Sequence, residues 1–122
     1  MIKMVGLLKR RPGMSVEAFR TYYESTHRRI GEKVLAGYAT RYVRRYLNPS
    51  GGSDAPTFGD AGDFDVILEV WYPDEAAAAA ALEHQSLPDV AREIFEDEMK
   101  LFDRDKNRFF VIEEVESQMP PL

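Results

Sequence analysis

Apolar residues alternate with polar ones in four segments of the chain, which predicts four β-strands. The segments are residues 2–10, 38–47, 64–72 and 108–116. A period of two is the pattern of an extended strand, whose side chains point to opposite faces in turn. All but the second segment carry apolar residues on both sides at their centres, so both faces of the sheet are expected to be covered.

The segment after the first strand repeats apolar residues every three or four positions, which predicts a helix. Ser15 is a suitable N-cap, and Phe19, Tyr23 and His27 follow at spacings of four. One face of this helix is therefore aromatic and includes a histidine. Gly31 marks an interruption or the end of the helix.

A second helical region is predicted after Pro73 and is interrupted near Pro88. Its alanine-rich first half needs no chemical explanation, because alanine is the best helix former. Ser86 and Asp89 have the spacing of a capping box, which predicts that the second half begins there.

The order βαββαβ predicts an α+β, ferredoxin-like fold with a four-stranded antiparallel sheet and both helical regions on one face. The other face, apolar in three strands, then needs a cover. We expect a second copy of the chain there, which gives a homodimer of the dimeric α+β barrel type. Residues 1–117 are expected to form this domain and 118–122 a tail. The Gly/Pro-rich segment 48–63 is either a lid or a surface insertion.

Composition narrows the chemistry and the partners. The chain has 122 residues and no cysteine, which excludes disulfides, thiolate metal sites and a cysteine nucleophile. No apolar run is long enough for a membrane span, so a cytoplasmic protein is expected. Residues 1–48 contain 11 Lys and Arg with 3 Asp and Glu, whereas residues 49–122 contain 5 and 18. With no helix-turn-helix or aromatic RNA-reading signature, this asymmetry favours pairing between two copies over nucleic-acid binding.

Two blocks of sequence resemble a known family. Residues 7–15, LLKRRPGMS, followed by Phe19, the triplet Tyr22-Tyr23-Glu24 and His27, resemble the opening of EthD-domain proteins. The triplet Phe102-Asp103-Arg104 before residues 109–115 resembles their closing strand. One departure is that Arg28 and Arg29 follow His27, where many relatives have a small residue and proline.

The resemblance implies a dimeric α+β barrel that acts on small molecules. Similar proteins include one linked to bacterial ether degradation and fungal dehydratase-like proteins of aromatic polyketides, and related barrels include polyketide cyclases and cofactor-free monooxygenases. Many relatives have no known activity.

His27 is the first candidate for a catalytic residue, because an imidazole exchanges a proton near neutral pH. The alternative is a histidine that only packs at a helix end. Tyr23, on the same face, and Glu69, provided that its side of the strand faces the pocket, complete the catalytic candidates. Those for substrate binding are Phe19, Tyr22, Tyr46, Trp71, Arg44, Asp103 and Arg104. Each of these also has an ordinary structural explanation, as core packing, a cap or an ion pair.

The leading hypothesis is a cofactor-independent enzyme that dehydrates or cyclises a small aromatic or polyketide-like molecule, with His27 as the proton-transfer group. An oxidoreductase of the cofactor-free monooxygenase type and a non-catalytic ligand-binding or accessory protein are the alternatives. The sequence has no dinucleotide fingerprint and no phosphate loop, and its two scattered histidines make a weak metal site, so neither a cofactor nor a metal is expected.

Overall fold

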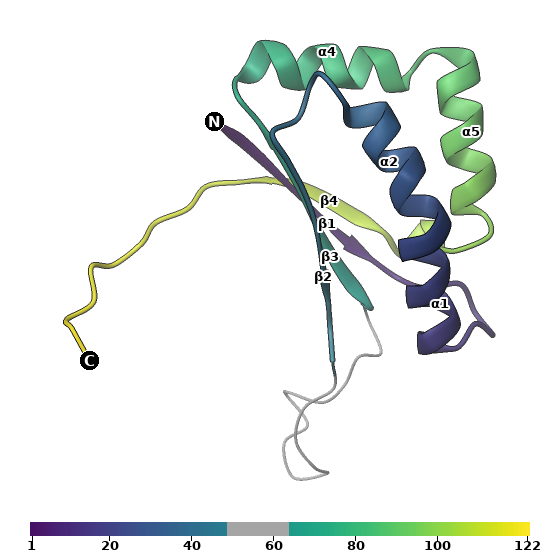
Figure 1. Cartoon of the computed structure of the whole chain (residues 1–122), viewed down its shortest axis with the longest axis horizontal. Helices are drawn as coiled ribbons and strands as arrows, with labels where there is room; N and C mark the ends of the chain where they lie inside the picture. Colours follow the sequence, from purple (N-terminus) through teal and green to yellow (C-terminus); the bar gives the residue numbers. More distant parts are fainter. Residues whose placement is uncertain (49–63) are drawn as a thin grey trace, which may run out of the picture.

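The computed structural model describes residues 1–48 and 64–122, so the lid or insertion predicted at 48–63 lies almost wholly outside the described residues. Its elements in chain order are β1 (Ile2–Leu8), α1 (Val16–Tyr22), η1 (Tyr23–His27), α2 (Arg28–Leu35), β2 (Arg41–Tyr46), β3 (Val66–Tyr72), α4 (Glu75–Gln85), α5 (Pro88–Glu98), η2 (Arg104–Lys106) and β4 (Arg108–Ile112) (Figure 1).

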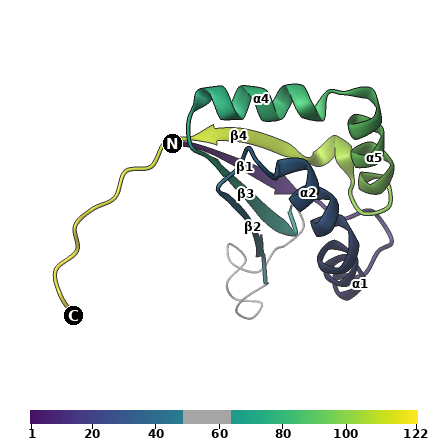
Figure 2. The ribbon, with the colours of Figure 1, turned by 45° about the horizontal axis from the view of Figure 1, so that its top comes forward.

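The four strands form one antiparallel sheet in the order β2-β3-β1-β4. All four labelled helices cover the same face of this sheet (Figure 1, Figure 2). The predicted α+β class and the ferredoxin-like βαββαβ arrangement are thus confirmed. The spacing of apolar residues was sufficient to predict the fold, because each of the two βαβ halves has its own strand and helix signals.

The strands are shorter than the sequence pattern predicts. β2 begins at Arg41 and not at residue 38, because the chain first turns through Gly37, whose φ of 87° is in the left-handed region. β4 ends at Ile112, whose partner Lys3 is the second residue of β1, so no partner strand continues beyond it. Residues 113–122 extend away from the domain (Figure 1).

The first helical region begins as predicted but does not end at Gly31. The Ser15 hydroxyl accepts a hydrogen bond from the amide of Ala18 at 3.0 Å. α1 then passes into a π-helical turn, η1, and α2 continues to Leu35. A glycine is needed inside α2 because a Cβ at position 31 would lie 2.6 Å from the hydroxyl oxygen of Tyr42.

We predict that Gly31→Ala lowers the free energy of unfolding by about 1–3 kcal/mol, because the added methyl overlaps the Tyr42 ring end. Helix propensity alone would predict a gain of about 1 kcal/mol. Urea unfolding measures the difference. In a Tyr42→Leu background the same substitution should cost less, and an equal cost in both backgrounds would contradict this explanation.

The second helical region differs from the sequence prediction at its break. Asp74 caps α4 by accepting a hydrogen bond from the amide of Ala77 at 2.8 Å. The capping box predicted at Ser86 is wrong: the N-cap of α5 is Leu87, and the Ser86 hydroxyl donates to the carbonyl of Leu82 at 2.8 Å. The hydroxyl is used to end α4, and Pro88 supplies the start of α5.

Two buried hydrophobic clusters fill the space between the sheet and the helices. The first consists of Leu8, Phe19, Tyr23, Val66, Leu101 and Phe102, and the second of Leu35, Val70, Tyr72 and Ala81. Tyr42 and Leu68 pack against both clusters. The site described below lies where the two clusters meet.

The face of the sheet opposite the helices carries both apolar and charged groups. The Lys3 ammonium lies 3.9 Å from the centre of the Trp71 ring, and Arg45 pairs with Glu69 at 3.0 Å. Phe110 on β4 is 52% exposed. No helix of the described residues covers this face (Figure 2).

We predict that a second copy of the chain covers this open face and that added salt weakens the dimer, because charged groups lie among the apolar ones there. Light scattering at low and high ionic strength checks both parts. A monodisperse monomer at all concentrations would contradict the dimer, and a dissociation constant independent of salt would contradict the charge contribution.

Candidate functional site

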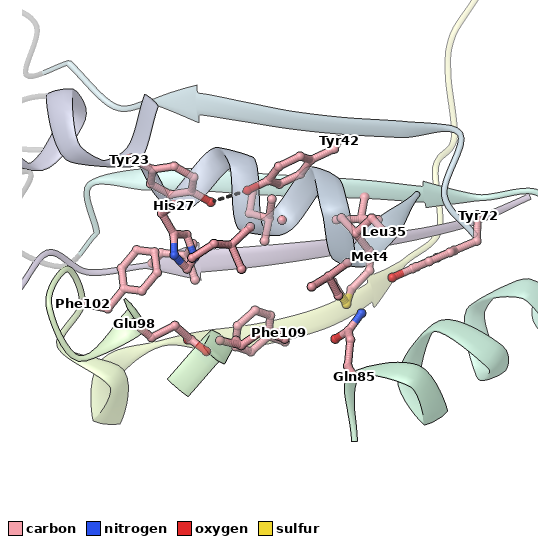
Figure 3. Close-up of a pocket in the computed structure, with 17 residues that line it drawn as sticks. Met4, Tyr23, His27, Leu35, Tyr42, Tyr72, Gln85, Glu98, Phe102 and Phe109 are labelled. Carbon is pink, nitrogen blue, oxygen red and sulfur yellow. Dashed lines mark hydrogen bonds between the residues drawn. The ribbon is translucent and has the colours of Figure 1, made fainter. Parts of the chain in front are cut away.

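A cavity of about 150 Å³ lies between the sheet and the helices (Figure 3). Its apolar wall comes from both layers and includes Met4, Leu8, Ile30, Val34, Leu35, Leu68, Val70, Ile94, Phe102 and Phe109. An engineered protein cavity of this size holds one benzene molecule. The cavity is therefore large enough for one aromatic ring.

Six polar side chains interrupt this apolar wall. They are Tyr23, His27, Tyr42, Tyr72, Gln85 and Glu98. A few polar groups in a mainly apolar concave surface are the usual composition of a small-molecule site.

His27 is held by a buried carboxylate. Its Nδ1 lies 2.7 Å from Oδ2 of Asp97, and both side chains are about nine-tenths buried. Because an ionised carboxylate only accepts hydrogen bonds, Nδ1 carries the proton in this pair. Nε2 is then the nitrogen of His27 that remains for a ligand in the cavity.

Tyr22 completes a line of three side chains. Its hydroxyl donates a short hydrogen bond to Oδ1 of Asp97, so each carboxylate oxygen has one partner. Burial, together with the adjacent Asp97 carboxylate, raises the pKa of Tyr22 to about 12. Tyr22 therefore remains a donor at neutral pH and fixes the carboxylate that orients His27.

The π-helical turn η1 places Tyr23 and His27 side by side in the cavity wall. Their rings make an edge contact with a centroid distance of 5.2 Å and an interplanar angle of 88°. Phe102 also makes an edge contact with the imidazole, at 5.3 Å, and Tyr23 and Phe102 contact each other at 5.7 Å, so the three rings form one cluster. π-helical turns are rare in proteins but common at functional sites, and this one packs the imidazole against two aromatic rings.

Tyr23 and Tyr42 form a hydroxyl pair beside the imidazole. The Tyr42 hydroxyl donates to the Tyr23 oxygen at 3.3 Å (Figure 3). Burial raises the pKa of both hydroxyls, most strongly for Tyr23. Both are therefore neutral at physiological pH, and a ligand oxygen can accept or donate there without meeting a negative charge.

Glu98 supplies a carboxyl group to the same end of the cavity (Figure 3). Burial raises its pKa, while the positive charge of Arg104 and a protonated His27 would lower it. The Arg104 Nε lies 3.7 Å from Oε2 of Glu98, on a side chain that is itself partly exposed. Glu98 and His27 are thus two proton-exchanging groups on one cavity wall.

Glu69 and Trp71, predicted as a catalytic and a binding residue, lie on the other face of the sheet. Leu68, Val70 and Tyr72 line the cavity, so the alternating residues of β3 point away from it. Glu69 accepts a hydrogen bond from Trp71 Nε1 at 2.6 Å, and this bond is the main cause of its lowered pKa. The predicted combination of Glu69 with His27 does not occur within the chain.

Arg44 and Tyr46, both predicted to bind substrate, are engaged outside the cavity by Glu24. The Arg44 guanidinium donates to both Glu24 oxygens, at 3.0 and 2.7 Å, and the Tyr46 hydroxyl donates at 2.6 Å. These bonds, led by that of Arg44, lower the pKa of Glu24. The arrangement connects η1 to β2 and so supports the wall that carries Tyr23.

The remaining residues predicted to bind substrate also lie outside the cavity wall. Phe19 is fully buried in the first cluster, and the amide of Asp103 donates to the carbonyl of Lys9 at 2.8 Å. Arg104 reaches the site only through Glu98. Tyr22 acts through Asp97. Of the predicted site residues, His27 and Tyr23 are thus the two that line the cavity.

Asp97 and Glu98 were not predicted, although they are the two carboxyl groups nearest to the chemistry. They stand in the acidic last turn of α5, EDE, which resembles an ordinary solvated helix end. The sequence contains one signal for Asp97, which is its position between Ile94 and Leu101 on the apolar stripe of the helix. Within residues 1–48 and 64–122, no three metal-binding side chains gather, and no helix could cross a membrane.

Comparison with known proteins assigns the chain to a family. The family model of the EthD domain matches residues 11–105. The chain belongs to the EthD domain family. The predicted resemblance to the EthD family is thereby confirmed. No curated protein matches the sequence significantly.

Solved structures of EthD proteins share the fold. One is an ethyl tert-butyl ether D (EthD) family protein from Bacillus halodurans C-125, which is 18% identical with a TM-score of 0.64 and matches over 94% of this chain and 100% of that one. An EthD-like protein from Ralstonia eutropha JMP134 is 16% identical with a TM-score of 0.57, over 84% of this chain and 82% of that one.

A structure described as an antibiotic biosynthesis monooxygenase is also similar. It is 15% identical with a TM-score of 0.54, and the match covers 95% of this chain and 100% of that one. At such identities the similarity establishes the shared fold, and function has to be argued from the site.

Proposed function

We propose that this EthD-domain protein is an enzyme that moves a proton on a small, flat, mainly apolar substrate, with His27 as the catalytic base. The observation that carries the proposal is a histidine in the wall of an apolar cavity whose Nδ1 is held by a buried carboxylate. A fixed tautomer with one nitrogen directed to the ligand is what general-base catalysis requires.

In a dehydration, Nε2 of His27 removes a proton from a carbon next to a substrate carbonyl. The electron pair of the broken C–H bond forms the new C=C bond, and the C–O bond of a β-hydroxyl breaks. The hydroxyl leaves as water with a proton from Glu98, which burial keeps protonated to higher pH than an ordinary glutamate. The proton held by His27 is returned to Glu98 directly or through solvent.

Groups around His27 stabilise the charges that develop during this cycle. As His27 becomes an imidazolium, the Asp97 carboxylate stabilises it at 2.7 Å. The neutral Tyr23 hydroxyl, whose oxygen accepts the hydrogen bond from Tyr42, is beside the imidazole and can donate its own proton to a carbonyl oxygen that becomes an enolate. These residues supply a base, an acid and an oxyanion site at one end of the cavity.

A monooxygenase is the second candidate, favoured by the similarity to an antibiotic biosynthesis monooxygenase. Its first step would be the same, because removal of a proton by His27 leaves an electron-rich carbanion or phenolate that molecular oxygen oxidises. The organic products distinguish the reactions: a dehydration product has lost one water from the substrate, whereas a monooxygenation product has gained an oxygen atom from O2, whose other atom leaves as water.

The test combines binding with product analysis. Wild-type protein is screened by thermal shift against hydroxylated aromatics, quinones and polyketide-like compounds, and every stabilising mixture is examined by mass spectrometry. We expect a bound compound whose mass falls by one water, whereas a gain of oxygen with oxygen uptake would establish the monooxygenase. A compound that binds and leaves unchanged across the panel would support the non-catalytic ligand-binding alternative.

The raised pKa of Glu98 predicts a pH-dependent stability. Relative to the ordinary value of 4.5, ionisation of the buried carboxyl is harder in the folded protein, so its contribution is fully present below that pH and is lost as the pH rises through the raised value. The Glu98→Gln variant has no carboxyl group at this position, so it does not lose stability in this way. Its free energy of unfolding should therefore increase relative to wild type between pH 4 and pH 8.

Urea unfolding across this pH range measures the difference. Glu96→Gln on the exposed side of α5 is the matched control. A wild-type and Glu98→Gln difference that stays constant with pH would show that Glu98 ionises as readily in the folded as in the unfolded chain.

A further inference from the structure

The cavity has a second polar end, distant from His27. Tyr72, the last residue of β3, and Gln85, the last residue of α4, lie at the end of the cavity opposite Tyr23, His27 and Phe102 (Figure 3). His27 directly precedes α2 and Leu35 ends it, a rise of about 12 Å along the helix axis. A ring that makes one hydrogen bond at each of two opposite substituents spans about this length.

The apolar middle of the cavity separates these ends. Ile30 and Val34, which lie between His27 and Leu35 along the helix, and Leu68 and Val70, which precede Tyr72 on β3, line the cavity and offer no hydrogen-bonding side-chain atom. A ring fits this section, since it needs only apolar contact on its faces. Any polar atom of the ligand has to lie at one end or the other.

Tyr72 is suited to recognise an oxygen. Its side chain is buried, with 5% of the residue exposed, and burial raises the pKa of its hydroxyl, with Gln85 acting in the opposite direction. The hydroxyl is therefore neutral and can donate. The Gln85 amide has N–H donors and a carbonyl acceptor, and a single tyrosine hydroxyl cannot satisfy all of them.

We propose that Tyr72 and Gln85 form a specificity subsite, and that the substrate is a single-ring compound with oxygen substituents at opposite positions, one at His27 and one at Tyr72. This inference rests on the proposed function in taking the cavity as the substrate site. It goes further in naming the substrate class and two residues that set it without taking part in proton transfer.

Hydroquinone and p-cresol are matched probes, because they differ only by a hydroxyl in place of a methyl group at the far position. Titration calorimetry under nitrogen should show that wild-type protein binds hydroquinone about five- to tenfold more tightly than p-cresol, the effect of one net hydrogen bond. In Tyr72→Phe and in Gln85→Leu this ratio should fall toward one, with p-cresol binding little changed.

Tyr38→Phe serves as the control, since Tyr38 stacks on His84 and does not line the cavity. It should keep the wild-type ratio. Equal binding of both probes by the wild type, or a preference that survives both subsite variants, would overturn the subsite.

The outcomes separate this inference from the proposed function. A ratio that depends on Tyr72, with no compound of the screen turned over, supports the subsite and counts against the enzyme. Turnover that depends on His27, with equal binding of the two probes, supports the enzyme and overturns the subsite. Failure of both probes to bind would overturn the subsite, and turnover in the compound screen would then decide the proposed function alone.

Discussion

Replacing His27 with alanine is expected to lower the turnover of the compound found in the screen by about 10²- to 10⁴-fold, the usual contribution of a positioned general base. Among the side chains that line the cavity in the described residues, the His27 imidazole is the one whose nitrogen is held by a buried carboxylate. Binding should persist, because the aromatic and aliphatic wall is unchanged. The measurement is a rate by mass spectrometry at saturating substrate, together with the thermal shift.

Two further variants make this result specific. Asp97→Asn keeps the shape of the side chain but no longer favours the Nδ1–H tautomer, so turnover should fall while the pH profile of the remaining activity shifts. His84→Ala is the matched control, because His84 stacks on Tyr38 at 5.3 Å and is outside the cavity wall. Wild-type turnover in His27→Ala would refute the catalytic assignment.

Asp97→Asn also distinguishes orientation from simple packing. If His27 only packed against Tyr23 and Phe102, an amide at position 97 would still hold the ring by a hydrogen bond and turnover would not change. A loss of turnover with intact ligand binding therefore points to the tautomer and charge of His27.

The fold was predictable because its signals are local. Strand alternation, the Ser15 cap and the turn before Pro88 each depend on a few adjacent residues, and the βαββαβ order follows from them. The errors were at ends and breaks. The end of β4 is set by the end of its partner β1, and the glycine inside α2 is explained by the Tyr42 side chain of β2, so both are decided by contacts between different elements.

The site was predictable only on one helix face. His27 and Tyr23 stand four residues apart, and that spacing alone places them together. Glu69 was assigned to the wrong side because alternation shows that a strand has two faces without showing which one meets the helices. Asp97 lies 70 residues from His27 in the sequence, and no local pattern connects them.

The predicted substrate contacts show why aromatic residues mislead. Phe19 has the same helical spacing as Tyr23, and Tyr46 lies on a predicted strand, but Phe19 is core and Tyr46 donates to Glu24. A difference of one turn along the helix separates a residue that lines the cavity from one that supports it. Only the packing of α1 on the sheet decides between these roles.

Phe19→Ala is accordingly expected to lower the free energy of unfolding by about 3–5 kcal/mol, the cost of removing a buried aromatic side chain and leaving a cavity. Phe19 has no exposed surface and makes edge contacts with Tyr23 at 6.1 Å and with Phe102 at 5.9 Å. Calorimetry or urea unfolding measures the loss. Phe95→Ala, at a residue that is 46% exposed, is the control and should cost far less.

The same pair of variants decides whether Phe19 belongs to the site. A residue of the core changes stability and leaves the affinity of the folded protein for p-cresol nearly unchanged, whereas a ligand contact weakens binding at a small cost in stability. Because Tyr23 and Phe102 stand between Phe19 and His27, a change in affinity would have to pass through the rings that hold the imidazole. A loss of unfolding free energy below about 1 kcal/mol, together with much weaker binding of p-cresol, would show instead that Phe19 contacts the ligand.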